Sequence, residues 1–157
     1  MMLKTIGLCI LIFTIYKVVS AKINALREGE YILDEIISLF KSTLSGVKNY
    51  MKPIGEEINT YSSPVLNKYG IKRAILDRDT EKIEDCHPLC EKSREVLIEY
   101  VRSYGGIDHS DEVARLTGLI SALESIERDL RSDTEKGKKL YTTLGASISF
   151  ALIILVI

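Results

Sequence analysis

Leu140-Tyr-Thr-Thr-Leu-Gly-Ala-Ser-Ile-Ser-Phe-Ala-Leu-Ile-Ile-Leu-Val-Ile157 is a run without a single charged side chain. As a helix it would be about 27 Å long, close to the ~30 Å hydrocarbon core of a bilayer. A second apolar run, residues 5–19, opens the chain and is interrupted by Lys17, and all 22 Asp and Glu residues lie between the two runs. The sequence therefore predicts an N-terminal transmembrane anchor (residues 1–22), a helical domain (residues 23–139) and a C-terminal transmembrane helix (residues 140–157).

The charge of the middle segment limits the possible partners. Residues 23–139 hold 18 Lys and Arg against 22 Asp and Glu, a net charge of -4. Nucleic-acid binding without sequence preference needs excess positive charge, so nucleic acid is not an expected partner. The segment is long enough for one small domain and too short for two.

Basic residues near the apolar runs predict the orientation of the chain. Those on the side of the domain are Lys17, Lys22, Arg27, Lys136, Lys138 and Lys139, whereas Lys4 is the only one on the other side. The positive-inside rule then places the domain in the cytoplasm. Tyr16, Lys17, Lys139 and Tyr141 are the expected residues of the membrane interface, where tyrosine rings and the ends of lysine side chains are favoured.

A different topology stays open for the first run. Val19-Ser20-Ala21 fits the small-residue rule for signal cleavage, and Lys4 supplies a positive charge before the apolar run. The alternative is a secreted or surface helical protein with a cleaved signal peptide and a C-terminal tail anchor. The mass of the mature chain would distinguish the two.

Apolar spacing in the middle segment is helical throughout, and no alternation of period two is long enough for a strand. Pro53 and Pro64 suit helix first turns, Gly70 suits a helix end, and Gly105-Gly106 ends a helix that we expect from Pro88 to Tyr104. Asp108 or Ser110 can cap the last helix, which continues as one rod of roughly 70 Å to the end of the chain. We expect an all-α protein with a bundle of about six helices. Its inward-facing residues should include Leu33, Ile37, Phe40, Val47, Tyr61, Tyr69, Leu97, Tyr100, Tyr104, Leu116, Ile120 and Leu123.

Catalytic chemistry has little support in the sequence. Cys86-His87-Pro-Leu-Cys90 is the one cluster with metal-ligand residue types, but zinc needs three or four ligands and the other histidine, His109, is far along the chain. Two cysteines helping to close a core are the simpler interpretation, and a metal-dependent enzyme is a third alternative. No nucleophile elbow or phosphate-binding glycine loop is present. We predict no catalytic residue, metal, cofactor or small-molecule substrate.

Two stretches resemble the stage III sporulation protein AB family of endospore-forming bacteria. One is Glu95-Val-Leu-Ile-Glu-Tyr-Val-Arg-Ser-Tyr-Gly-Gly-Ile-Asp108, and the other is Lys138-Lys-Leu-Tyr-Thr-Thr-Leu-Gly145 followed by the uncharged end. Lys52-Pro-Ile-Gly-Glu-Glu-Ile58 matches a proline-containing helix start of the family more loosely. The chain departs from the family pattern at Leu44-Ser-Gly-Val47, at position 112 or 113, and in lacking a mid-domain tryptophan.

The resemblance implies a domain similar to the inner-membrane platform proteins of type II secretion. It implies a place in the mother-cell membrane around the forespore, in a channel-like complex with other membrane proteins, and docking of a cytoplasmic secretion-type ATPase. From charge and expected exposure, we place the partner contact on the two short middle helices. The residues of this predicted surface are Glu56, Glu57, Lys68, Lys72 and Arg73.

Overall fold

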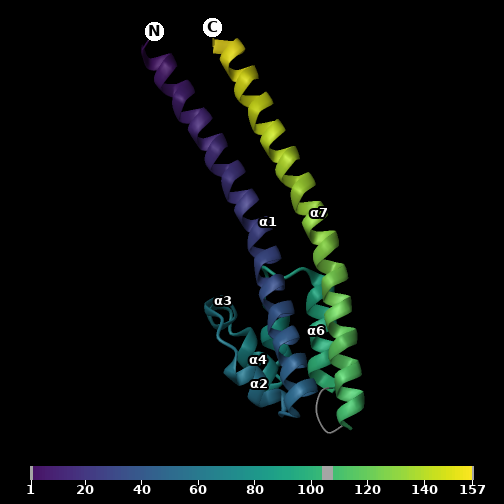
Figure 1. Ribbon diagram of the computed structural model, residues 1–157. Helices are drawn as coiled ribbons and strands as arrows, with labels where there is room; N and C mark the ends of the chain where they lie inside the picture. Colours follow the sequence, from purple (N-terminus) through teal and green to yellow (C-terminus); the bar gives the residue numbers. More distant parts are fainter. Residues whose placement is uncertain (1, 104–107, 157) are drawn as a thin grey trace. The chain divides into compact units, whose positions relative to one another are not determined.

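The computed structural model describes residues 2–103 and 108–156, and it describes their side chains except at positions 2–6, 8, 9, 155 and 156. Over these residues the chain forms seven helices and no strand (Figure 1), so the predicted all-α class is confirmed. Two helices are far longer than the others: α1 (Met2–Tyr50) and α7 (His109–Val156). The chain divides into two compact units, unit 1 with residues 1–28 and 131–157 and unit 2 with residues 29–130.

Unit 2 is a helical bundle with a closed apolar core. Phe40 on α1 is fully buried, and its ring meets Tyr100 of α6 (Glu91–Ser103) edge to face, with ring centroids 5.3 Å apart. The predicted periodicity holds on α1 and α7, because the residues at helical spacing are the buried ones. Fully or almost fully buried core residues include Leu33, Ile37, Phe40, Val47, Leu97, Leu116, Ile120 and Leu123, whereas Tyr61 and Tyr69 are partly buried.

Four short helices connect α1 to α6: α2 (Ile54–Thr60), α3 (Pro64–Lys68), α4 (Ile71–Asp77) and α5 (Thr80–Glu84). Pro53 immediately precedes α2, and Pro64 is the first residue of α3. Gly70 has a φ of 67°, which suits the glycine between α3 and α4. The predicted breaks at these three residues are confirmed.

Helix α5 was not expected, because its residues are mostly charged. Arg78 takes a φ of 56° and ends α4, and the Asp79 carboxylate accepts the backbone N–H of Lys82 as the α5 cap. Ile83 is fully buried and fixes the helix against the core. A capping aspartate and one buried isoleucine are enough to specify this single turn.

Helix α6 begins at Glu91, so the expected start at Pro88 is wrong. The N–H of Leu89 donates to the Cys86 carbonyl over 3.0 Å, which makes the segment from Cys86 to Cys90 a turn. The first helical bond of α6 runs from Arg94 N–H to the Cys90 carbonyl. The turn lies so close to α1 that a methyl group on Gly29 would overlap the carbonyl oxygen of Pro88. The segment from Cys86 to Cys90 therefore forms a turn against α1, and α6 starts after it.

Helix α7 runs without a break from His109 to Val156, as predicted. Asp108 caps it: its carboxylate accepts the N–H of His109 over 2.9 Å, and its carbonyl accepts the N–H of Glu112. Gly137 does not interrupt the helix. The predicted turn at Gly105-Gly106 and the predicted core position Tyr104 lie outside the described residues.

Unit 1 consists of the first part of α1 and the last part of α7, which run antiparallel side by side. The register is given by two glycines of α7. A methyl group added to Gly137 would lie 3.0 Å from the Leu26 side chain, and one added to Gly145 would lie 3.0 Å from Val19. The two helices therefore approach closely where α7 has no side chain. The predicted domain limits at 22/23 and 139/140 remain predictions, because compactness does not locate a membrane boundary.

Candidate functional site

Helices α2, α3 and α4 form a surface hollow of about 640 Å³ in unit 2. Its apolar residues are Leu76, which is half-buried, and Leu66, which is fully buried, and polar lining residues come from Asn59, Asn67, Arg73 and Asp77. We call this the α4 hollow. Protein interfaces use the same combination, in which an apolar anchor fills a recess and polar groups surround it.

Two of the five predicted partner residues, Lys72 and Arg73, line the α4 hollow, and they differ in what holds them. The Lys72 ammonium donates to the carbonyl oxygens of Asn59 at 2.5 Å and Tyr61 at 2.7 Å, so it links the end of α2 to α4. The Arg73 side chain is 80% exposed and contacts Asp77 over 3.2 Å. An exposed ion pair of this kind is weak, so Arg73 can exchange Asp77 for a partner carboxylate more easily than Lys72 can leave its carbonyls.

The other three predicted partner residues lie away from the lining of the hollow. Glu56 is exposed. Glu57 has a side chain only 13% exposed and pairs with Lys52 over 2.8 Å, and this hydrogen bond raises the pKa of Lys52. Lys68 donates to the Tyr69 hydroxyl over 3.0 Å. The structure therefore brings together only part of the predicted set.

The side chains of the Cys86 to Cys90 segment, which include the metal-ligand residue types, differ in their burial and contacts. Cys86 is buried, and burial raises the pKa of its thiol. Cys90 lies 3.3 Å from the Ser93 hydroxyl, while His87 is exposed. No group of three His, Cys, Asp or Glu side chains within residues 2–103 and 108–156 is arranged to hold a metal ion. Of the two cysteines interpreted as core residues, Cys86 is buried in the core and Cys90 is only partly buried.

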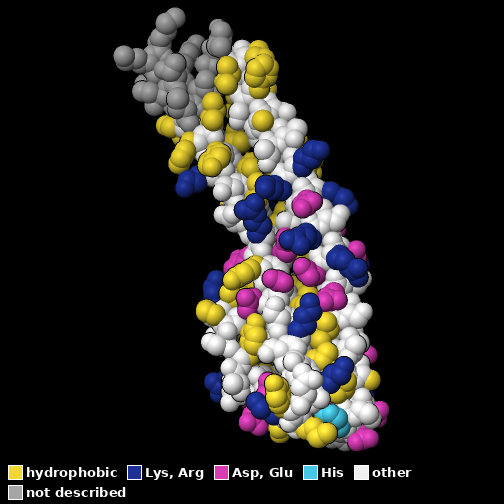
Figure 2. All heavy atoms as spheres, in the orientation of Figure 1, with side chains coloured by type: hydrophobic (Ala, Val, Ile, Leu, Met, Phe, Trp, Pro, Cys, Tyr) yellow, Lys and Arg dark blue, Asp and Glu magenta, His cyan; other side chains and the backbone are white. Residues whose placement is uncertain are grey.

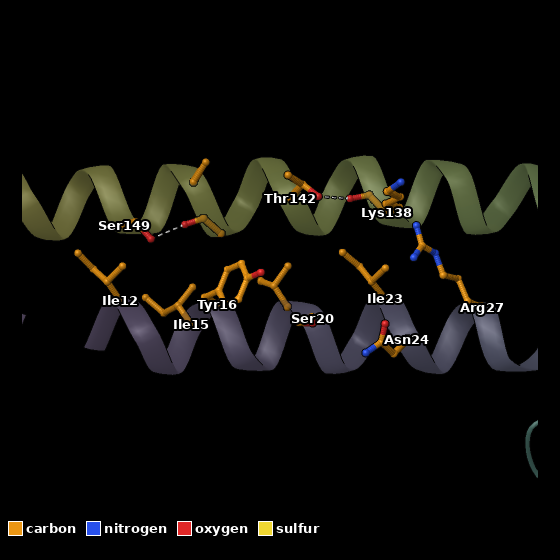
Figure 3. Close-up of a pocket in the computed structure, with 13 residues that line it drawn as sticks. Ile12, Ile15, Tyr16, Ser20, Ile23, Asn24, Arg27, Lys138, Thr142 and Ser149 are labelled. Carbon is orange, nitrogen blue, oxygen red and sulfur yellow. Dashed lines mark hydrogen bonds between the residues drawn. The ribbon is translucent and has the colours of Figure 1, made fainter. Parts of the chain in front are cut away.

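Unit 1 contains a groove that the sequence analysis did not identify. It has a volume of about 480 Å³ and is open along the contact between α1 and α7. Figure 3 shows Ile12, Ile15 and Tyr16 toward one end, and Arg27 reaching across the groove toward Lys138 at the other end. The two basic residues were counted as membrane flanks, but their meeting depends on the antiparallel register, which no local pattern reveals.

Large apolar side chains are exposed on both helices of unit 1, and Figure 2 shows them toward the chain ends. The most exposed are Tyr16 at 68%, Phe150 at 66% and Ile154 at 62%. Within the described parts of the helices, none has a stretch both long and apolar enough to cross a membrane. Exposed apolar surface of this extent is uncommon in soluble monomers and marks a contact surface for protein or lipid.

The four predicted interface residues all lie in unit 1. The Lys17 ammonium lies 5.5 Å from the centre of the Phe13 ring, Lys139 is exposed, and Tyr141 is half-buried. Because Gly145 faces Val19 and Gly137 faces Leu26, Tyr141 is level with about residue 22 of α1. Tyr16 is then about six residues, or roughly 9 Å, further toward the chain ends. The two tyrosines mark different levels along the helix pair.

The geometry defines a class: an all-helical protein whose two longest helices contribute to a packed bundle in one unit and expose apolar side chains in the other. The chain matches the family model of stage III sporulation protein AB over residues 5–157, and it belongs to that family. The predicted resemblance is confirmed, and membership connects the chain with sporulation. No curated protein and no solved structure matches it.

Proposed function

We propose that this chain is a non-enzymatic membrane platform component of the channel complex between mother cell and forespore. Unit 1 embeds in the mother-cell membrane around the forespore, with two passes. Unit 2 lies in the cytoplasm and docks a secretion-type ATPase through the α4 hollow. Family membership supports the sporulation role, and the exposed apolar side chains of unit 1 are the observation that carries the membrane attachment.

The membrane part of the proposal has two further supports. The sequence from Leu140 to Ile157 is uncharged, and α7 continues into it as helix, so the backbone polar groups are satisfied internally as lipid requires. Apart from Lys17, which lies beside Phe13, the exposed lysines and arginines of unit 1 whose side chains are described lie toward its other end (Figure 2), where they would meet head groups and cytoplasm. Both features suit a helix pair that enters a bilayer from the cytoplasmic side.

Docking at the α4 hollow is supported by its chemistry. A partner with an apolar side chain beside a carboxylate would place the first against Leu76, which is half-buried, and the second on Arg73. Arginine holds a carboxylate with two parallel hydrogen bonds, which gives both orientation and energy. Lys72 keeps α2 and α4 in place and so preserves the shape of the recess.

A capture experiment tests the docking. The full chain in detergent is immobilised, and retention of the secretion-type ATPase from the same organism is measured for the wild type and for Arg73→Glu. We expect Arg73→Glu to reduce retention at least about tenfold, since it replaces a charged contact by a like-charge pair. Lys92→Glu makes the same charge change on an exposed residue of α6 and should retain the ATPase normally. Equal retention by wild type and Arg73→Glu would exclude the α4 hollow as the docking surface.

Cysteine labelling tests the orientation. In a chain whose natural cysteines are replaced, Ser121→Cys puts one thiol on the exposed face of α7 in unit 2. A membrane-impermeant maleimide should label it only after the cells are permeabilised. Labelling in intact cells would instead support the secreted or surface topology with a cleaved signal peptide.

A further inference from the structure

The groove in unit 1 has two chemically different ends. Ile12, Ile15 and Val19 of α1 provide an apolar wall, and Ala146 of α7 lines the opposite side. Arg27 and Lys138 close the other end (Figure 3). A groove of this design matches a long amphiphile with an anionic head.

The cationic end of the groove differs from other charged parts of the protein in its ion pairing. Within the part of the chain that the structure describes, neither the Arg27 guanidinium nor the Lys138 ammonium pairs with a carboxylate. Other exposed cations in the protein do: Lys41 pairs with Glu124 over 2.8 Å and Lys136 with Asp133 over 3.4 Å. Two like charges at the same end of a groove repel, and an anion between them turns this repulsion into two attractive contacts.

The apolar part has a suitable length. From Ile12 to Arg27 the helix rises about 22 Å, which exceeds half of a ~30 Å hydrocarbon core. Gly145 and Ala146 have little or no side chain, so α7 leaves space beside the isoleucines of α1 while the two helices stay in close contact. An acyl chain from one leaflet fits this length. Between the two ends, Asn24 lines the groove at the level expected for the glycerol ester groups.

We propose that the unit 1 groove binds one anionic phospholipid, with its phosphate between Arg27 and Lys138 and one acyl chain along Ile12, Ile15 and Val19. The proposal rests on the membrane attachment proposed above, because that attachment places Arg27 and Lys138 at head-group level. Two cations without acidic partners favour a head group with net negative charge, such as phosphatidylglycerol. A choline head group would bring its own ammonium toward Arg27 and Lys138.

Spin-labelled lipids test the binding directly. The full chain is reconstituted in phosphatidylcholine nanodiscs that contain a trace of spin-labelled phosphatidylglycerol or spin-labelled phosphatidylcholine, and the motionally restricted fraction is compared. The wild type should restrict phosphatidylglycerol preferentially. Arg27→Gln with Lys138→Gln should reduce this preference about tenfold or more, because both charge-assisted contacts with the phosphate are lost. Lys22→Gln with Lys139→Gln removes two exposed cations outside the groove and should retain the preference.

A second pair of variants tests the apolar part. Ala146→Leu fills the groove, and Ala151→Leu adds the same volume at an exposed position of α7 outside it. Only Ala146→Leu should reduce the restricted fraction. Equal preference in the two charge variants, or equal restriction in the two leucine variants, would overturn the lipid site.

Failure of the site and failure of the membrane attachment give different results. If the chain is recovered free of nanodiscs, the attachment itself is wrong, and the lipid site fails with it. If the chain is incorporated but shows no preference for phosphatidylglycerol, the site is wrong and the attachment stands.

Discussion

Helices α1 and α7 each take part in both units, yet their large apolar side chains are mostly buried in unit 2 and mostly exposed in unit 1. In unit 2, Ile36 and Phe40 of α1 are completely buried. In unit 1, Phe13 of the same helix is 61% exposed, and Phe150 of α7 is 66% exposed. Both parts are continuous helix, so the difference lies in what surrounds the side chains.

The comparison shows what each unit requires. Unit 2 covers its apolar residues with four short helices and α6, which is enough to close a core. Unit 1 has only two helices, and two helices cannot cover all their own apolar side chains. Such a pair is stable in contact with a further apolar phase, which we propose to be lipid.

Removing a large aromatic ring should show the difference between the two units most clearly. Phe40→Ala leaves a cavity beside Tyr100 and should lower the free energy of unfolding of unit 2 by about 3–5 kcal/mol. Phe13→Ala removes the same atoms from an exposed position of unit 1 and should leave that free energy unchanged. Denaturant titration of the full chain in detergent, followed by circular dichroism, measures both. Similar losses would contradict the division into a packed unit and an exposed one.

Two glycine substitutions should change the stability of unit 2 in opposite directions. Gly29→Ala pushes a methyl group into the Pro88 carbonyl and should destabilise unit 2 by about 1–3 kcal/mol. Gly118→Ala meets nothing within 4 Å and should stabilise α7 by about 0.5–1 kcal/mol. The same titration measures both changes. If Gly29→Ala proved neutral, the close contact between α1 and the Cys86 to Cys90 turn would be wrong.

Alkaline pH should weaken unit 2 through Cys86. Burial raises the pKa of this thiol in the folded state. The stability that the neutral, buried thiol contributes to unit 2 is therefore fully present below the unfolded pKa of about 8.5, and it is lost as pH rises through the folded pKa. Unfolding free energies measured at neutral and at alkaline pH should therefore differ less in Cys86→Ala than in the wild type. An identical pH dependence in both proteins would mean that the thiol is as well solvated folded as unfolded.

The smallest effect is expected at an exposed ion pair. Lys41→Met removes the contact with Glu124, whose hydrogen bond raises the pKa of Lys41. Both side chains are well exposed, and water screens such pairs, so the denaturation midpoint should hardly move. A loss comparable with that of Phe40→Ala would show that surface charge, and not the apolar core, dominates the stability of unit 2.

Local signals in the sequence located most of the helices. Pro64 and Gly70 mark their turns because each restricts or frees the backbone at one position, independently of the rest of the fold. The start of α6 could not be found in this way, because the close approach of Pro88 to Gly29 is a long-range contact. The pairing of Arg27 with Lys138 in one groove has the same origin, since it depends on the register between the two ends of the chain.

The partner surface shows the same limit. Charge and expected exposure selected Glu57 and Lys72 together with Arg73. In the structure Glu57 is held by Lys52 and Lys72 by two carbonyls, and Arg73 keeps an exposed side chain at the hollow. A sequence pattern indicates which residues are polar, but it does not indicate which of them already satisfy one another.

The most direct test of the membrane attachment is alkaline carbonate extraction of membranes from sporulating cells that produce the full chain. The account predicts that the chain stays in the membrane pellet, and that detergent releases it. A chain that carbonate transfers to the supernatant would contradict the embedding of unit 1, whatever else unit 2 binds.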